Sequence, residues 1–164
     1  MESRTRKKNT TSLTQKLRKA IGNINVDVFG YEKNVTRNIH TYFDRISKET
    51  DMPKDQIIVR IFKDYGQIRV CVHKEGKRIK EIPVSELVML FTNTDPLGLP
   101  HLQQKAIDGI QSFMMEYCTT HLIHPSNLHI CILTSGDQVF VKGINGTREI
   151  GAIPLMTLIK HFTK

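Results

Sequence analysis

The sequence has little of what defines several protein classes. It contains no tryptophan, three cysteines, ten glycines and six prolines among 164 residues. This low glycine and proline content excludes collagen-like and low-complexity chains, and the hydrophobic fraction of 39% excludes a wholly disordered one. The longest apolar runs, such as 87–91, are far shorter than the roughly 20 residues of a membrane span. We therefore expect one or two small domains with a buried core and no membrane segment.

The cysteines and the N-terminus bear on the compartment. Cys71, Cys118 and Cys131 are odd in number, which is typical of reduced thiols in a cytoplasmic, intracellular protein. The basic start is not followed by an apolar stretch, so it does not predict a secretory signal. A transit peptide stays open as an alternative, because the segment 1–21 is basic and has apolar residues near one helical face.

The sequence resembles itself when 39–92 is placed over 110–163 without a gap. We call the sequence offset between equivalent positions of the two copies, for example from 39 to 110, the repeat interval. The ten identical positions are Ile39/Ile110, Ile61/Ile132, Gln67/Gln138, Val70/Val141, Ile79/Ile150, Ile82/Ile153, Pro83/Pro154, Leu87/Leu158, Phe91/Phe162 and Thr92/Thr163. Nearly all of them are apolar, and they keep both order and phase. The pattern predicts an internal duplication.

Each copy has the same predicted elements. Apolar residues at helical spacing are followed by a loop with Pro53 or Pro125, which ends the helix. Three alternating apolar segments follow as strands, joined by turns such as Glu75-Gly76 and Asn145-Gly146. A second helix then closes the unit. The predicted fold class is α+β: a duplicated unit of a helix, a three-stranded antiparallel meander and a helix.

The predicted divisions follow from these patterns. Residues 1–22 form a basic, partly helical arm, and 23–35 form a strand and connection, because 24–28 alternate between apolar and polar residues. Residues 36–92 are the first repeat, 93–100 a turn-rich linker and 101–164 the second repeat. Because one such unit has little core, we expect both repeats to pack as one compact body. Whether their sheets are continuous or face to face is left open.

Positive charge is concentrated at the start of the chain. The formal net charge is +8, yet residues 1–20 hold seven basic residues against one acidic residue. The seven are Arg4, Arg6, Lys7, Lys8, Lys16, Arg18 and Lys19. Such an arm suits the phosphate backbone of DNA or RNA, because each bound cation releases a condensed counterion. A solubilising tail is the alternative interpretation.

A second basic cluster lies at the turn between the second and third strands of the first repeat. Its four cations are Lys74, Lys77, Arg78 and Lys80. A projecting basic hairpin is able to follow a phosphate backbone. Lysines at such an edge also discourage pairing between sheets, which is the simpler explanation.

Motifs for other chemistry are weak. Cys118, His121 and His124, with His129, resemble zinc ligands, but their spacing matches no standard zinc finger. Cys71 and Cys131 lie in apolar strands, where a thiol is inert, and no carboxylate pair is spaced for acid–base catalysis. We therefore expect no catalytic residues, no metal and no cofactor. An active site assembled only by the fold stays an alternative.

These patterns favour a non-enzymatic intracellular protein associated with nucleic acid, acting as an accessory or scaffold protein. The eleven basic residues of the arm and the hairpin would contact phosphates without reading the sequence, and DNA and RNA are not distinguished. The alternative is a module for protein–protein interaction or assembly without a nucleic-acid role. In that case the nearly neutral second repeat would supply the surface for a partner or for self-association.

Overall fold

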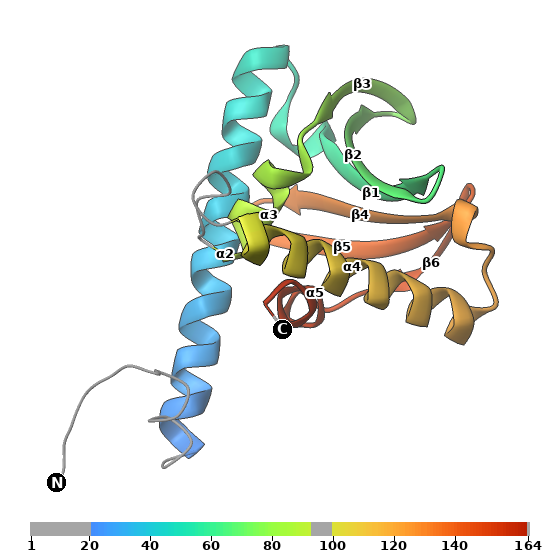
Figure 1. Ribbon diagram of the computed structural model, residues 1–164. Helices are drawn as coiled ribbons and strands as arrows, with labels where there is room; N and C mark the ends of the chain where they lie inside the picture. Colours follow the sequence, from blue (N-terminus) through green and yellow to red (C-terminus); the bar gives the residue numbers. More distant parts are fainter. Residues whose placement is uncertain (1–20, 93–99, 164) are drawn as a thin grey trace, which may run out of the picture. The chain divides into compact units, whose positions relative to one another are not determined.

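The computed structural model describes residues 21–92 and 100–163 (Figure 1). It divides into two compact units, Met1–Asn34 and Val35–Lys164. The described part of the first unit is the beginning of helix α2 (Ile21–Thr50). The sheet, the core and the other helices belong to the second unit. None of the described helices is long and apolar enough to cross a membrane.

The strand predicted at 24–28 is wrong, because these residues lie within α2. The alternating run is short, and alternation stabilises a strand only where a neighbouring strand accepts its hydrogen bonds. No proline occurs between Ile21 and Thr50, and the one interior glycine, Gly30, lowers helix stability by only about 1 kcal/mol. The helix therefore extends through the segment.

The second unit contains two similar runs of elements, and the α+β class is confirmed. After α2 come η1 (Lys54–Gln56), β1 (Ile58–Asp64), β2 (Gln67–Lys74), β3 (Lys77–Ile82) and α3 (Val84–Thr92). Next are α4 (Pro100–His121), η2 (Pro125–Asn127), β4 (Leu128–Ser135), β5 (Gln138–Asn145), β6 (Arg148–Ala152) and α5 (Leu155–Phe162). The predicted linker lies mostly outside the described residues.

All six strands form one antiparallel sheet in the order β3-β2-β1-β4-β5-β6. Hairpins join the strands of each meander, and the two meanders meet where β1 pairs with β4. In that ladder Arg60 lies opposite Cys131, and Ile61 lies opposite Ile130. The question left open by the sequence is thus answered, because the sheet is continuous.

Local backbone signals set the ends of these elements. Both α2 and α4 end in a left-handed residue, Asp51 and Leu122, after which a backbone N–H bonds back to the helix. Proline follows each end within three residues and prevents the helix from resuming. The β2–β3 turn has positive φ at both Glu75 and Gly76. Such a turn matches the right-handed twist of the strands that it joins.

The two outer strand pairs each contain one irregularity. The β2–β3 register shifts between Val72 and His73, and the β5–β6 register shifts between Gly143 and Ile144. A bulge places one extra residue in a strand and thereby changes which side chains face each side of the sheet. The bulge therefore decides where the side chains of β3 lie.

One face of the sheet packs against the helices, and we call it the covered face. It includes Ile61, Val70, Ile132 and Val141, all buried. A β-carbon at Gly143, also on this face, would lie 2.5 Å from the hydroxyl of Tyr117 in α4. Figure 1 shows α3, α4 and α5 together on this side of the sheet. The main core therefore lies between the covered face and the helices.

Side chains alternate along each strand, so the intervening residues point the other way. We call this opposite side the uncovered face, because none of the described helices packs on it. Its residues on the four inner strands are Ile58, Arg60, Phe62, Asp64, Gln67, Arg69, Cys71, His73, His129, Cys131, Leu133, Ser135, Gln138, Phe140, Lys142 and Ile144. This mixture of cations, imidazoles and apolar groups differs from the covered face, whose central residues are apolar.

Phe91 of α3 and Phe162 of α5 stack on each other within the core. Their ring centroids are 4.5 Å apart, their planes differ by 10°, and both are buried. This contact joins the closing helix of one meander to that of the other. It is the helical counterpart of the β1–β4 ladder.

We predict that Phe91→Ala and Phe162→Ala each lower the free energy of unfolding by about 3–5 kcal/mol, because each leaves a large cavity. A double-mutant cycle measured by urea unfolding should give a coupling of about 0.5–1.5 kcal/mol from the stacked rings. Met115→Ala, at a residue that is 48% exposed on α4, is the control and should have little effect. Strictly additive losses would show that the rings do not act as a pair.

Candidate functional site

The structure does not test the phosphate contacts predicted for the basic arm. Its predicted phosphate contacts, Arg4, Arg6, Lys7, Lys8, Lys16, Arg18 and Lys19, lie outside the described residues. They remain a prediction from charge alone.

The basic hairpin is described, and its four cations do not form one strip. Lys74 and Lys77 lie opposite each other next to the turn. Arg78 lies on the uncovered face, with its guanidinium carbon 5.6 Å from the ring centroid of Phe62. Lys80 is opposite Val72 on the covered face. Strand alternation together with the bulge therefore places Arg78 and Lys80 on opposite sides of the sheet.

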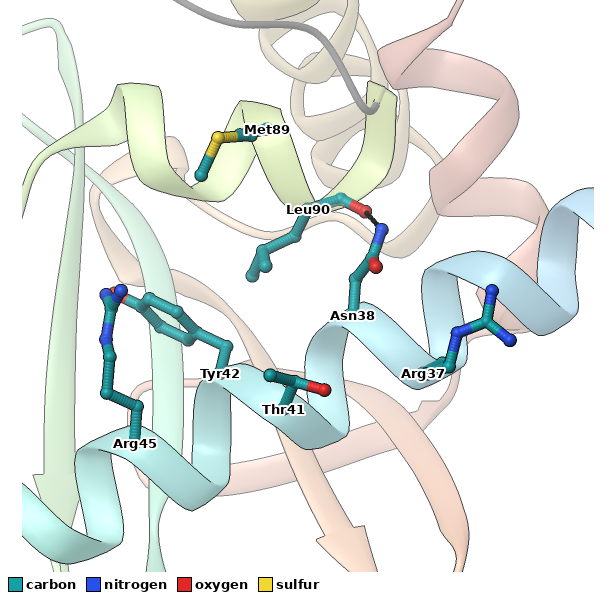
Figure 2. A pocket seen from close by; sticks show the side chains of 7 residues that line it. All are labelled: Arg37, Asn38, Thr41, Tyr42, Arg45, Met89 and Leu90. Carbon is teal, nitrogen blue, oxygen red and sulfur yellow. Dashed lines mark hydrogen bonds between the residues drawn. The ribbon is translucent and has the colours of Figure 1, made fainter.

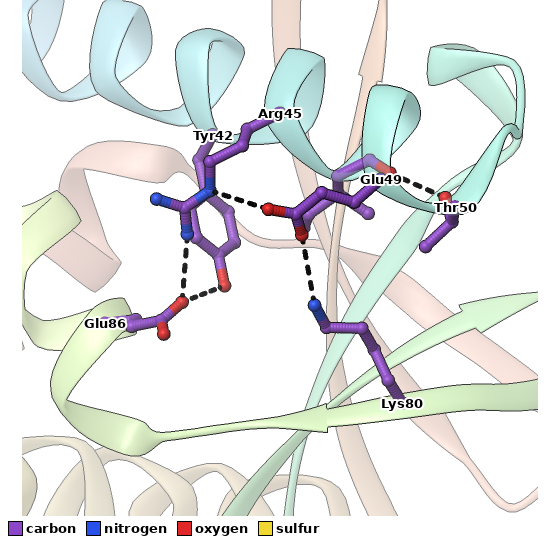
Figure 3. Close-up of polar contacts among 7 residues, drawn as sticks. Tyr42, Arg45, Glu49, Thr50, Lys80 and Glu86 are labelled. Carbon is purple, nitrogen blue, oxygen red and sulfur yellow. Dashed lines mark hydrogen bonds and ion pairs between the residues drawn. The ribbon is translucent and has the colours of Figure 1, made fainter.

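Lys80 belongs to a polar network between β3 and the helices (Figure 3). Its Nζ lies 3.3 Å from Glu49 in α2, and Glu49 also pairs with Arg45. Arg45 and the Tyr42 hydroxyl both donate to Glu86 at the start of α3. Burial and this hydrogen bond raise the pKa of Tyr42, which keeps its hydroxyl protonated. These charges neutralise one another and connect α2 with α3 and β3.

A shallow pocket of about 400 Å³ lies beside this network, between α2 and α3 (Figure 2). Its lining includes Asn38, whose amide donates to the carbonyl of Leu90 at 3.2 Å. The corresponding contact between α4 and α5 is closer, since a β-carbon at Gly109 would lie 1.9 Å from the carbonyl oxygen of His161. The pocket therefore lies where an asparagine holds two helices apart.

A different arrangement occupies the uncovered face. Arg60 is at its centre, in the row Cys71–Arg60–Cys131 across β2, β1 and β4. Two other cations of this face are neutralised: Arg69 pairs with Asp64 at 2.9 Å and with Glu81, and Lys142 lies 3.1 Å from Glu149. Neither Arg60 nor Arg78 forms an ion pair with another described residue. Among the described residues of this face they are the two cations without an ion pair, and we call them uncompensated in this sense; the charge of Arg78 does contribute to lowering the pKa of Glu81.

A stacked pair of rings, the imidazole of His129 and the phenyl ring of Phe62, lies beside Arg60. The ring of His129 stacks on that of Phe62, with centroids 4.9 Å apart and planes 12° apart. Burial lowers the pKa of His129 to about 4, and the charges of Arg60, His73 and Arg78 contribute to this shift. Burial, Arg60 and Arg78 also lower the pKa of His73. Both imidazoles are therefore neutral at pH 7.

Several buried nitrogens on this face have no hydrogen-bond partner among the described protein atoms. They are both ring nitrogens of His73, Nδ1 of His129 and Nε of Arg60. Only one other side-chain atom in the described part of the chain is in this condition, Nε2 of His40. Buried polar groups are nearly always bonded, so this concentration within three residues needs an explanation.

The four residues considered as zinc ligands are not brought together. Cys118 is buried in α4 and His129 is on the uncovered face, so the sheet separates them. His121 is exposed at the end of α4, and His124 bonds to Ser126 instead. Within residues 21–92 and 100–163, no group of three His, Cys, Asp or Glu side chains is placed to hold a metal ion.

Sequence reasoning missed Arg60, His73 and His129 as a group. A signal was present, since each follows an apolar residue of a strand and is in the phase that faces away from the core. It was not sufficient, because the three belong to three strands of two repeats. Only the register of β2, β1 and β4 places the two histidines on either side of Arg60.

No family model matches the chain, and searches of curated proteins and of solved structures found no match.

We predict that the free energy of unfolding falls as the pH is lowered from about 6.5 to 4. In this interval an unfolded histidine takes up a proton, whereas folded His129, with its pKa of about 4, resists protonation. The loss from this residue is on the order of 1–3 kcal/mol, allowing for its partial exposure. Urea unfolding at a series of pH values measures it. His129→Gln should flatten the pH dependence, whereas His124→Gln should leave it unchanged; identical curves for both variants would contradict the assignment.

Proposed function

We propose that the chain is an internal duplication of a unit of a helix, a three-stranded meander and a helix. In support, Pro125–Asn127 follows Lys54–Gln56 by the repeat interval, and the bounds of β5 follow those of β2 by the same interval. The left-handed residues Asp51 and Leu122 are separated by this interval as well. So are the two register shifts, Val72/His73 and Gly143/Ile144.

An approximate two-fold axis relates the two copies. In the β1–β4 ladder Arg60 pairs with Cys131, its own equivalent in the second copy. Phe91 likewise stacks on its equivalent, Phe162. Equivalent residues touch one another only near a symmetry axis, so the axis passes through the centre of the sheet and through the stacked rings.

The copies agree on the covered face and differ on the uncovered one. Ile61/Ile132, Val70/Val141 and Ile82/Ile153 are identical and lie on the covered face. On the uncovered face the pairs Ile58/His129, Arg60/Cys131, Phe62/Leu133, Arg69/Phe140, Cys71/Lys142, His73/Ile144, Arg78/Glu149 and Glu81/Ala152 all differ, and the identical pair Gln67/Gln138 lies at the strand ends next to the turns. A shared core explains the agreement. The differences favour a ligand that contacts the two halves of the face in different ways.

The function that we propose is that of a non-enzymatic accessory or scaffold protein that binds the phosphate backbone of nucleic acid. The observation that carries it is the pair of uncompensated guanidiniums, Arg60 and Arg78, on a sheet face without helices. Arg60 is half-buried whereas Arg78 is exposed. A half-buried cation without a counter-charge is unfavourable, and a phosphate at Arg60 would relieve the cost. Guanidiniums also match the geometry of phosphate oxygens.

The basic arm extends this proposal. Its seven cations, Arg4, Arg6, Lys7, Lys8, Lys16, Arg18 and Lys19, would add affinity independent of sequence. Lys74 and Lys77 next to the β2–β3 turn would continue the contact from Arg78. Lys80 is the weakest of the predicted contacts because it pairs with Glu49.

We predict that Arg60→Gln and Arg78→Gln each weaken binding of the full-length protein to short DNA and RNA oligonucleotides. Each should lower the slope of log affinity against log salt by about one contact. Fluorescence anisotropy over a salt series measures this. Lys63→Gln is the matched control, because Lys63 is on the same strand as Arg60 but on the covered face. Equal effects of all three substitutions would contradict binding through the uncovered face.

The arm is tested separately in the full-length chain by replacing its seven cations with glutamine. If the arm and the uncovered face both contact phosphate, the seven-glutamine variant keeps weak binding to the oligonucleotide. Adding Arg60→Gln to this variant then removes the remaining binding. If the arm alone binds, affinity is lost at once and Arg60→Gln has no effect.

The alternative function is protein interaction or self-association. Leu133 and Phe140 lie opposite each other and form an apolar end of the uncovered face, and Phe140 is 44% exposed. Such a patch suits a protein partner or a second copy. The light-scattering mass and partner retention at high salt distinguish the two functions, because apolar contacts resist salt and phosphate contacts do not. Complexes stable at high salt and lost in Phe140→Ser would favour the alternative.

A further inference from the structure

The unpartnered nitrogens of the uncovered face belong to neighbouring residues on three adjacent strands. His73 is on β2, Arg60 on β1 and His129 on β4. On β1, Arg60 lies between Ile58, which is opposite His73, and Phe62, which is opposite His129, so one imidazole flanks Arg60 on each side. The charge of Arg60 lowers the pKa of both histidines. His73 is only 8% exposed, and neither of its ring nitrogens has a partner among the described protein atoms.

The chemistry of the cluster selects an anion. The permanent charge of Arg60 would repel a metal cation from the two imidazoles. Guanidinium N–H groups only donate hydrogen bonds, and an imidazole donates from one nitrogen when neutral and from two when protonated. A group rich in acceptor oxygens would therefore satisfy the cluster, and a phosphate offers several such oxygens together with negative charge.

The carboxylates of the face do not compete for this position. Asp64 and Glu81 both pair with Arg69, and Glu149 pairs with Lys142. Arg78, over the ring of Phe62, is the other nearby cation and adds to the positive potential. The thiols of Cys71 and Cys131 stay protonated, because burial raises the pKa of each.

We propose that Arg60, His73 and His129 form a recessed site for a single phosphate group. The inference rests on the proposed function in that the phosphate would be one of a nucleic-acid backbone. Arg60 anchors the phosphate by charge, and the two imidazoles donate hydrogen bonds to its oxygens. The site belongs to the asymmetric part of the duplication, because the equivalents of Arg60, His73 and His129 are Cys131, Ile144 and Ile58.

Such a site couples binding to protons. A phosphate beside His73 and His129 favours the imidazolium form, because opposite charges attract and the charged ring donates from both nitrogens. Binding therefore raises the pKa of both histidines. By linkage, affinity for the phosphate rises as the pH falls through the pKa values of the bound and free histidines, which for His129 means from about pH 6 to 4.

The experiment follows the histidine ring signals of the full-length protein by NMR as a function of pH, at low salt. The titration is recorded for the protein alone, for the protein with a short single-stranded oligothymidine, and for the protein with inorganic phosphate. We expect the oligonucleotide to raise the pKa of His129 by about one unit or more, and that of His73 in the same direction. His124, which is exposed and bonded to Ser126, should not move.

The outcomes separate this site from the proposed function. If the oligonucleotide binds and neither histidine shifts, the site is wrong and binding through other cations stands. If inorganic phosphate shifts the histidines and the oligonucleotide does not bind, the site takes free phosphate and the proposed function fails. If nothing binds and nothing shifts, both are wrong.

Variants provide a second test of the site. Arg60→Gln should abolish the shift of His129 in the presence of oligonucleotide, whereas Arg60→Lys keeps the charge and should preserve part of it. The matched control Lys63→Gln should leave the full shift. If Arg60→Gln fails to fold, the comparison of Arg60→Lys with Lys63→Gln still decides: equal shifts in these two would exclude the guanidinium as the anchor.

Discussion

The pairing of β1 with β4 is the interaction on which the rest of this fold depends. A three-stranded meander leaves both outer strands with unpaired backbone groups, and one such sheet has little core. The β1–β4 ladder removes two of these four edges and extends the hydrophobic face across six strands. It also fixes the distance between α3 and α5, so that Phe91 and Phe162 meet and stack. Sheet continuity and helix packing are thus consequences of one register.

The same pairing gives the two faces of the sheet different roles. The helices bury one face, and there both halves of the chain keep the same apolar residues at Ile61/Ile132 and Val70/Val141. The other face is not needed for helix packing, so its residues are free to differ. In our proposal this freedom permitted a cationic group around Arg60 and an apolar pair at Leu133 and Phe140. Stability and recognition then depend on opposite sides of the same strands.

Much of the fold was predictable because its signals are local. The alternation of Ile57, Val59 and Ile61 and the Asn145-Gly146 turn specify a strand and a hairpin within a few residues. The strand at 24–28 was wrong because alternation alone cannot supply a neighbouring strand. The candidate site was largely beyond prediction, since it depends on the non-local register of three strands and on a bulge that separates Arg78 from Lys80.

The central claim, that ligand is bound by one face of the sheet only, is tested most directly by isoleucine methyl NMR. Ile58 and Ile144 lie on the uncovered face, whereas Ile61 and Ile132 lie on the covered face of β1 and β4. On addition of a short oligonucleotide, the account predicts shifts of the Ile58 and Ile144 δ1-methyl signals and none for Ile61 and Ile132. Shifts confined to the covered-face methyls, or saturable binding that leaves all four unmoved, would contradict it.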